Sequence, residues 1–231
     1  MAITPQLTDD SPVIIDVISD VMCPWCLVGK RMLRKALTLR PDTPVQIRWR
    51  PYQLDPTIPK GGMDRKEYLR RKFGEAAGGQ MYQRLKDIGE AEGIEFNFSA
   101  IPRSPNTLDA HRLIRWAAND GVQEKVVDRL FAVYFSEGGD IESIDTLKEI
   151  AREAGMDADL VASLLEKGAD IDLVKREADL ARQMGVDGVP CFVFDEQFAV
   201  MGAQPPDVLA QYIDRAIANR AKTAEPSPGG L

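Results

Sequence analysis

The stretch VMCPWCLVGKRML, residues 21–33, decides the fold because it joins a predicted strand to a predicted helix through two cysteines. Before it, residues 13–19 (VIIDVIS) form a short β-branched run that is typical of a buried strand. After Cys26, apolar residues recur at helical spacing. Pro24 suits the first position of a helix because that position needs no backbone N–H. Cys23 is therefore predicted to lie where a strand ends and a helix begins.

This position suits the CPWC pair to thiol–disulfide exchange. A cysteine exchanges with disulfides only as the thiolate, and a free thiol with a pKa of about 8.5 is mostly protonated at neutral pH. The unpaired amides and the positive dipole end of a helix lower the pKa of a thiol at its N-terminus. Cys23 is thus the predicted nucleophile, and Cys26, on the same turn and close enough to form a disulfide with it, is the predicted resolving thiol.

Two other interpretations of the pair stay open. Cysteine is commonly buried in protein cores, so the pair would then be structural. Cys23, Cys26, Cys191 and His111 together also make a set of four zinc ligands. Against zinc, the pair heads an apolar helix and the remaining ligands are far apart in the sequence, whereas zinc-binding CxxC pairs usually occupy tight turns and recur. We therefore favour a redox pair and expect no metal.

The flanking segments complete a sheet. Residues 45–50 (VQIRWR) alternate as a second strand should, which makes the start of the chain a β-α-β unit with parallel strands. Near the end, residues 191–195 (CFVFD) and 197–201 (QFAVM) indicate a β-hairpin with a short turn at Asp195-Glu196. An amphipathic helix follows the hairpin.

A helical block separates these two parts. Residues 51–62 hold three prolines and two glycines, which excludes a helix or a central strand. Helical patterns with repeated stops at glycine follow. We predict an α/β fold in which residues 13–62 and residues 173–219 together form one sheet domain. Residues 63–172 are predicted to be a large all-helical insertion domain, and residues 220–231 a disordered tail.

Composition excludes several classes of partner. The 231 residues are 44% apolar and 28% charged, as in a globular protein. Basic residues number 29 and acidic residues 36, so a nucleic-acid partner or an anionic membrane surface is not expected. No run could span a bilayer, and the first twelve residues show no secretion signal. We expect a cytoplasmic protein, where a CxxC pair is more often catalytic or metal-binding than structural.

Residues 188–194 (GVPCFVF) lead into the returning strand. Pro190 stands where a cis proline fits, because X–Pro bonds alone take that form readily. A trans proline that merely starts the strand is equally compatible with this stretch. A cis bond would expose the backbone of Val189 for pairing with an extended peptide.

With CPWC at residues 23–26 and GVP at residues 188–190, the chain resembles the DsbA family of thioredoxin-fold oxidoreductases. The likeness is to its FrnE-like branch, which is related to 2-hydroxychromene-2-carboxylate isomerases and kappa-class glutathione transferases. It covers residues 13–219 and extends to the stretches RWRPYQLDPTIP, PNTLDAHRL and GVDGVPCFVFDEQFAVMGAQPPDVL. The resemblance implies a thioredoxin fold interrupted by a helical domain, with Pro190 as a cis proline beside the catalytic cysteines.

The resemblance also implies a substrate site. The isomerases and transferases of this group typically carry serine in place of Cys23 and bind glutathione, so the presence of both cysteines argues for thiol–disulfide chemistry. Glutathione is expected as a co-substrate, and no cofactor is expected to be tightly bound. The helix that follows residue 105 overhangs the active site in this branch. The predicted substrate-binding residues are Pro24, Trp25, Asn106, Thr107, His111 and Val189.

The sequence departs from the family at several points. Thioredoxins place a buried acid six residues before the first cysteine, where this chain has Val17. Asp20 is nearer the motif, but it stands three positions after Val17, an odd spacing, so its side chain is expected on the other face of the strand. It is therefore only a candidate auxiliary group for proton transfer. A Pro-Trp dipeptide replaces the Pro-His of DsbA, which predicts weaker oxidising power. Cys191 follows the expected cis proline and should lie near the CPWC pair, either as an alternative disulfide partner or, as we favour, as an ordinary buried residue.

These observations predict a thiol–disulfide oxidoreductase that acts through the CPWC pair on protein or glutathione disulfides. The expected partners are disulfide-bearing proteins or glutathione, and the expected assembly is a monomer or a homodimer. Two alternatives belong to other classes of protein. One is a glutathione-dependent isomerase or transferase of small aromatic compounds, and the other is a non-enzymatic zinc-binding or protein-binding module.

Overall fold

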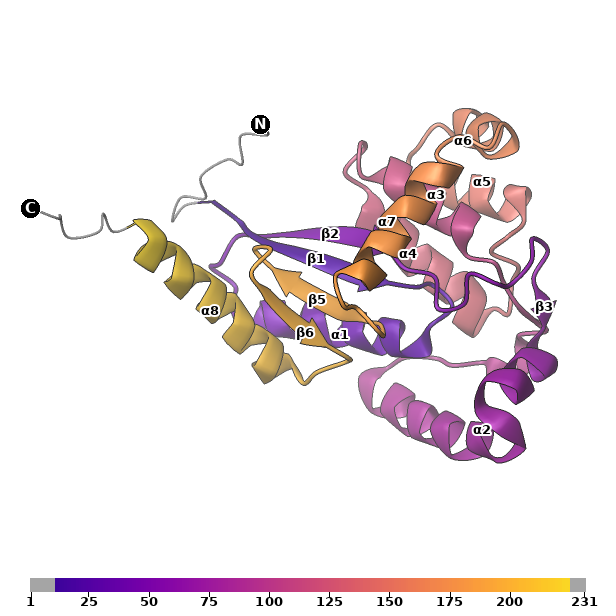
Figure 1. Ribbon diagram of the computed structural model, residues 1–231, viewed down its shortest axis with the longest axis horizontal. Coiled ribbons are helices and arrows are strands. Elements are labelled where there is room, and N and C mark those ends of the chain that lie inside the picture. Colours follow the sequence, from indigo (N-terminus) through magenta and orange to yellow (C-terminus); the bar gives the residue numbers. More distant parts are fainter. Residues whose placement is uncertain (1–10, 225–231) are drawn as a thin grey trace, which may run out of the picture.

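The computed structural model describes residues 11–224; for residues 75–78 and 223–224 it describes the backbone alone. A mixed sheet lies at the centre, flanked by helices from the two ends of the chain and by a separate helical block (Figure 1). The predicted α/β architecture, a thioredoxin-like sheet with a helical insertion, is confirmed.

The chain begins with the predicted β-α-β unit. Strand β1 (Val13–Ser19) leads through a short turn into helix α1 (Pro24–Thr38), and strand β2 (Val45–Pro51) follows. β1 and β2 are parallel and pair along their whole length. The β-branched side chains of β1 suit a strand that is covered on both faces, and six of its seven residues are buried.

The returning hairpin completes the sheet. Strand β5 (Cys191–Phe194) pairs antiparallel with β1, and strand β6 (Phe198–Met201) pairs antiparallel with β5. The strand order is β2-β1-β5-β6, so β1 is central. Asp195 and Glu196 both have positive φ, 49° and 59°, which gives the hairpin turn the twist that joins two adjacent strands.

Helix α8 (Pro206–Ala224) follows the hairpin and packs beside α1. It extends further than the sequence predicted, since residues 220–224, expected in the tail, are helical. Arg220 holds this last part in place, because its guanidinium donates to both carboxylate oxygens of Asp195 at 2.7 Å. Residues 225–231, also expected to be disordered, lie outside the described residues.

The segment between β2 and β5 forms the helical block, which occupies the right-hand side of Figure 1. It is helical apart from two strands of two residues each, which pair antiparallel and were not predicted. Its elements are β3 (Met63–Asp64), α2 (Arg65–Glu92), η1 (Phe98–Ala100), β4 (Arg103–Ser104), α3 (Leu108–Ala117), α4 (Gln123–Phe131), the π-helix η2 (Ala132–Ser136), α5 (Ile144–Ala154), α6 (Ala158–Glu166) and α7 (Ile171–Gln183).

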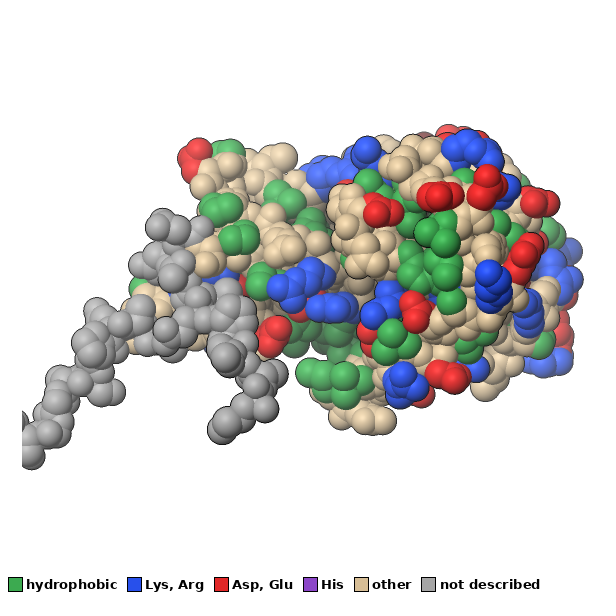
Figure 2. Space-filling view, turned by 90° about the horizontal axis from the view of Figure 1, so that it is seen from above, with side chains coloured by type: hydrophobic (Ala, Val, Ile, Leu, Met, Phe, Trp, Pro, Cys, Tyr) green, Lys and Arg blue, Asp and Glu red, His purple; other side chains and the backbone are tan. Residues whose placement is uncertain are grey.

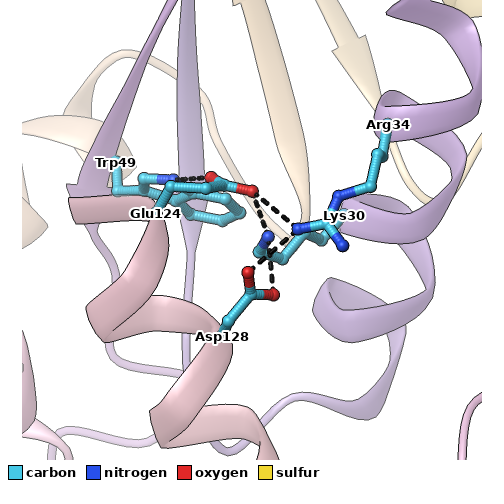
Figure 3. A network of polar contacts seen from close by, with 5 residues as sticks. All are labelled: Lys30, Arg34, Trp49, Glu124 and Asp128. Atoms are coloured by element: carbon cyan, nitrogen blue, oxygen red, sulfur yellow. Dashed lines mark hydrogen bonds and ion pairs between the residues drawn. The ribbon is translucent and has the colours of Figure 1, made fainter. Parts of the chain in front are cut away.

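A buried lysine ties this block to the first helix of the sheet domain. The ammonium of Lys30 in α1 lies between the carboxylates of Glu124 and Asp128 in α4 (Figure 3). Arg34, one turn further along α1, contacts the same two carboxylates, and the indole of Trp49 in β2 donates to Glu124 at 2.9 Å. Because Lys30 is only 4% exposed, this network fixes α4 against α1 at the side of the sheet where the CPWC helix lies.

The two faces of the sheet carry different packing. Val17 of β1 and Phe192 of β5 face the main core, which also includes Cys23 and Cys26. The alternate residues face a smaller cluster on the opposite side, because successive strand residues point to opposite faces. That cluster consists of Ile18, Tyr52, Ala181, Val186 and Cys191.

The surface mixes both signs of charge. On the face drawn in Figure 2, acidic and basic side chains are interspersed over the helical block. Within residues 11–224, no helix is both long and apolar enough to cross a membrane.

Candidate active site

Cys23 occupies the N-cap of α1. Its backbone is extended, with φ −89° and ψ 114°, and Pro24 opens the helix as predicted. No side chain caps the helix, so the first-turn amides are directed toward the region of the Cys23 sulfur. The Cys23 amide donates to the carbonyl of Asp20 at 3.0 Å, which fixes the turn between β1 and α1. The sulfur is therefore held at the positive end of the helix dipole.

The loop before β5 lies directly against this sulfur. The Val189–Pro190 peptide bond is cis, and the Cys23 thiol donates to the carbonyl of Val189 at 3.6 Å. Gly29, which the sequence analysis did not single out, permits this approach. A Cβ atom at Gly29 would lie 2.7 Å from the Pro190 ring and 3.1 Å from the Phe192 ring. The absence of a side chain at Gly29 thus sets how closely α1 approaches the cis proline.

Cys26 lies behind Cys23 and is 1% exposed. Burial raises the pKa of the Cys26 thiol well above its usual range, and the neighbouring Cys23 sulfur raises it further. The Ser19 hydroxyl and the backbone of Asp20 oppose this rise. Cys23 and Cys26 are free thiols in this structure. Both cysteines are therefore buried, Cys23 at 4% and Cys26 at 1% exposed, and the Cys23 sulfur contacts the cis-proline loop.

Asp20 and His111 meet beside the motif. The fully buried carboxylate of Asp20 accepts from the amide of Leu54 at 2.7 Å and from that of Met22 at 3.4 Å. The Nε2 atom of His111, on α3, lies 2.9 Å from the carbonyl oxygen of Tyr52 and 3.4 Å from a carboxylate oxygen of Asp20. A ring nitrogen beside a carbonyl must donate, so Nε2 carries a proton. His111 thereby joins α3 to the turn that precedes Cys23.

The other two residues predicted here, Asn106 and Thr107, lie at the start of α3. The side chain of Asn106 donates to the carbonyl of Ile58 at 2.6 Å and accepts from the amide of Leu108 at 3.1 Å. It thus fixes the loop after β2 to the start of α3, as a capping side chain does. Thr107 is buried at the N-cap of α3 and makes no capping hydrogen bond with its side chain. Their predicted contact with substrate stays a prediction.

Helix α2 contributes groups beside the motif that the sequence analysis did not identify. The guanidinium of Arg84 lies 5.5 Å from the centre of the half-buried Trp25 ring. Tyr68 is buried, and burial raises the pKa of its phenol, to which the charges of Asp55, Asp20 and Cys23 add. A cavity of about 260 Å³ lies between α2 and the loop after β2. It is lined by Asp55, Thr57, Pro59, Met63, Tyr68, Arg71 and Lys72.

Cys191 does not lie with the other two cysteines. It belongs to the cluster on the opposite face of the sheet, although it follows Pro190 directly. Burial raises the pKa of its thiol to about 11, and the charge of Asp187 contributes. The expectation that Cys191 lies near the CPWC pair is therefore wrong, because strand alternation turns its side chain away. The predicted alternative of an ordinary buried residue fits this placement.

The same placement bears on the zinc interpretation. Cys191 lies in the cluster opposite the one that holds Cys23 and Cys26, so the four expected ligands do not converge. Across residues 11–224, no group of three or more His, Cys, Asp or Glu side chains is arranged to hold a metal ion.

Comparisons with known proteins agree with this geometry. The DSBA-like thioredoxin domain family matches residues 14–214. The crystal structure of a probable DsbA oxidoreductase, SCO1869 from Streptomyces coelicolor, is 30% identical with a TM-score of 0.79, covering 95% of this chain and 93% of that one. The uncharacterized protein YwbO of Bacillus subtilis is 27% identical over 201 residues, 86% of this chain and 94% of that protein.

A more distant structure shares the fold. A 2-hydroxychromene-2-carboxylate isomerase is 15% identical with a TM-score of 0.66, covering 92% of this chain and all of that one. The resemblance predicted from the CPWC and GVP stretches is thereby confirmed at the level of the family. The family model covers most of the chain, and the structure places the cysteine pair at the N-terminus of a helix. The chain belongs to the DSBA-like thioredoxin domain family.

Proposed function

We propose that the protein is a thiol–disulfide oxidoreductase in which Cys23 is the nucleophile and Cys26 the resolving thiol. The observation that carries this proposal is the position of the Cys23 sulfur, at the N-terminus of α1 and 3.6 Å from the Val189 carbonyl of the cis-proline loop. Free amides and the helix dipole stabilise an anionic sulfur at such a position. Membership of the DsbA-like family supports oxidoreductase activity in general.

The steps follow from the order of the two sulfurs, with Cys23 against the cis-proline loop and Cys26 behind it. The Cys23 thiolate attacks one sulfur of a substrate disulfide, forms a mixed disulfide with it and releases the other substrate sulfur as a thiolate. Cys26 then loses its proton and attacks the Cys23 sulfur. A Cys23–Cys26 disulfide forms, and the second substrate sulfur leaves. The substrate disulfide is reduced by two electrons and the motif is oxidised; the reverse sequence oxidises a substrate dithiol.

We assign substrate binding to the cis-proline loop beside the Cys23 sulfur and to the cavity that Tyr68 lines. The backbone of Val189 offers an extended peptide or glutathione hydrogen-bonding groups beside the reacting sulfur. The cavity between α2 and the loop after β2, whose wall includes Tyr68, is a second candidate region; it presents Arg71, which is paired with Glu67, and Lys72 beside Asp55. Cationic side chains of this kind suit the carboxylates of glutathione or of an acidic peptide. Pro24 and the half-buried Trp25, between the two motif cysteines, stay proposed substrate contacts.

The test measures both half-reactions in single-turnover experiments with oxidised glutathione and with a disulfide-bonded peptide. Cys23→Ser should abolish reduction of both, and Cys26→Ser should accumulate a mixed disulfide that mass spectrometry detects on Cys23. Cys191→Ser is the matched control, because its side chain lies on the other face of the sheet, and it should behave as the wild type. Wild-type reduction by Cys23→Ser would reject the proposal. Turnover of a small aromatic compound with glutathione by Cys26→Ser would favour an isomerase or transferase instead.

A further inference from the structure

The resolving step requires a route for a proton. Cys26 attacks only as a thiolate, yet it is 1% exposed and burial raises its pKa. Val17 supplies no acid–base group, and the Asp20 carboxylate already accepts two backbone amides. A proton that leaves Cys26 therefore needs another path through the protein, and the residues behind the motif provide one.

The first member of that path is Ser19, the last residue of β1. Its side chain is on the same face of the strand as Val17, toward the core that holds Cys26. Ser19 is 4% exposed, and its hydroxyl makes no hydrogen bond of ordinary geometry among the described residues. The hydroxyl nonetheless lies near enough to Cys26 to counter part of the rise in the pKa of that thiol. A buried hydroxyl without a partner normally costs free energy, so its retention calls for an explanation.

A small cavity lies beside Ser19. Its volume is about 10 Å³, close to the least room that one water molecule requires. It is lined by Ser19, Val21, Trp49, Arg50, His111, Ile114 and Val127. A buried water needs polar partners, and the side chains of Ser19 and His111 supply them in this wall.

His111 connects this cavity to a larger one. With Trp49, Arg50 and Ile114 it also lines a cavity of about 180 Å³ between β2 and helices α3 and α7. Because the Nε2 of His111 donates to the Tyr52 carbonyl, its Nδ1 is the nitrogen that accepts a proton. An imidazolium formed in this way lies beside the Asp20 carboxylate, 3.4 Å from Nε2.

The charged groups around His111 come from every element packed against it. They are Asp20 before α1, Arg50 on β2, Arg115 on α3, Glu124 on α4, Asp170 before α7 and Glu177 on α7. Four of these groups, Arg50, Arg115, Asp170 and Glu177, line the larger cavity and carry both signs of charge. Arg115 is paired with Glu177 and lies 3.8 Å from Asp170. This charged wall gives a proton on His111 an exit to solvent.

We propose that the small cavity binds one water molecule, and that Ser19, this water and His111 together carry the proton of Cys26 to the larger cavity. The Cys26 thiol gives its proton to the Ser19 oxygen as the hydroxyl proton of Ser19 passes to the water, and the water passes a proton to Nδ1 of His111. No electron moves in this relay. The sulfur–sulfur exchange at Cys23 follows once Cys26 is a thiolate, so the relay rests on the proposed function.

The test is Ser19→Ala, a change that removes the hydroxyl and little volume. The resolving rate is measured in a single turnover, as release of the second substrate thiol from a preformed mixed disulfide on Cys23, between pH 5.5 and 9. Ser19→Ala should slow this step about tenfold or more near neutral pH. The deficit should shrink as the pH rises, because hydroxide then takes the proton directly. Alkylation of Cys23 by iodoacetamide should proceed as in the wild type.

Two comparisons make the outcome specific. Ser104 on β4 is also fully buried with an unpartnered hydroxyl, so Ser104→Ala controls for the loss of such a group and should leave the resolving rate unchanged. Ser19→Ala combined with His111→Gln should be no slower than the slower single variant, because both residues handle the same proton. A wild-type resolving rate in Ser19→Ala at every pH would overturn the relay. So would a double variant whose loss in rate equals the product of the losses in the two single variants. The Cys23 and Cys26 variants test the proposed function separately, so the two failures are distinguishable.

Discussion

Gly29→Ala tests how tightly α1 is held against the cis-proline loop. The added methyl would lie 2.7 Å from the Cγ atom of Pro190, so the helix or the ring would have to move by about 0.7 Å to reach the 3.4 Å of an ordinary contact. Overpacking of this kind costs about 1–3 kcal/mol. Replacing glycine by alanine within a helix returns about 0.5–1 kcal/mol. The expected net loss is about 1 kcal/mol, which lowers the Tm of a chain of this size by about 2–4 °C.

The same movement should be visible in the chemistry. Separation of α1 from Pro190 changes the distance between the Cys23 sulfur and the Val189 carbonyl, which is 3.6 Å in the native protein. A misplacement approaching 1 Å costs up to about 10²-fold in rate, so disulfide reduction should slow by about tenfold. The assays are thermal unfolding followed by circular dichroism and single-turnover reduction of a disulfide-bonded peptide.

Gly79→Ala provides the matched control. Gly79 also lies within a helix, α2, but a Cβ atom there would meet no atom within 4 Å. Its substitution should therefore leave the protein equally stable or stabilise it by up to about 1 kcal/mol. If Gly29→Ala matched Gly79→Ala in both Tm and reduction rate, the close approach of α1 to Pro190 would play no part in the site.

Three further predictions concern other parts of the molecule. Because the pKa of Cys191 is raised to about 11, iodoacetamide should label this thiol at pH 8 at least about tenfold more slowly than a peptide thiol of pKa about 8.5. Peptide mass spectrometry measures the two rates, and equal rates would show that the thiol is accessible. Lys30→Ala should destabilise the protein by about 1–3 kcal/mol in urea titrations, because it leaves two carboxylates without their buried partner. Lys35 is half-exposed and also ion-paired, so Lys35→Ala should cost less than about 1 kcal/mol. Burial raises the pKa of Tyr134 to about 12, so the folded state binds more protons than the unfolded state above the usual value of about 10, and stability should fall as the pH rises from 10 to 12. Tyr134→Phe should fall less steeply, and an unchanged slope would contradict this cause.

Local patterns in the sequence were sufficient for the elements that carry the motif. The β-branched run before CPWC, the proline after Cys23 and the Asp195-Glu196 turn are short-range signals, and each indicates the backbone that the structure has. The fold could be predicted from them because the two outer parts of the chain have the periodicities of one sheet and its helices.

The rest of the site depends on contacts between distant segments. Gly29 matters only because Pro190 lies against it, and Ser19 only because the helical block encloses a cavity behind it. Tyr68 is one aromatic residue among many in helical patterns, so nothing in the sequence distinguished it. Cys191 is a different case, because strict alternation along the predicted strand would already have turned it away from its neighbour, the cis proline.

The order of the strands also affects how the protein is made. Since β1 is central and pairs on one side with β5, one edge of this strand has no partner until residues 191–194 have left the ribosome. Val189 and Pro190, which complete the surroundings of the Cys23 sulfur, also emerge late. During most of synthesis the nascent chain thus carries its two motif cysteines on an unfinished sheet, and the redox centre is assembled only when translation is nearly complete.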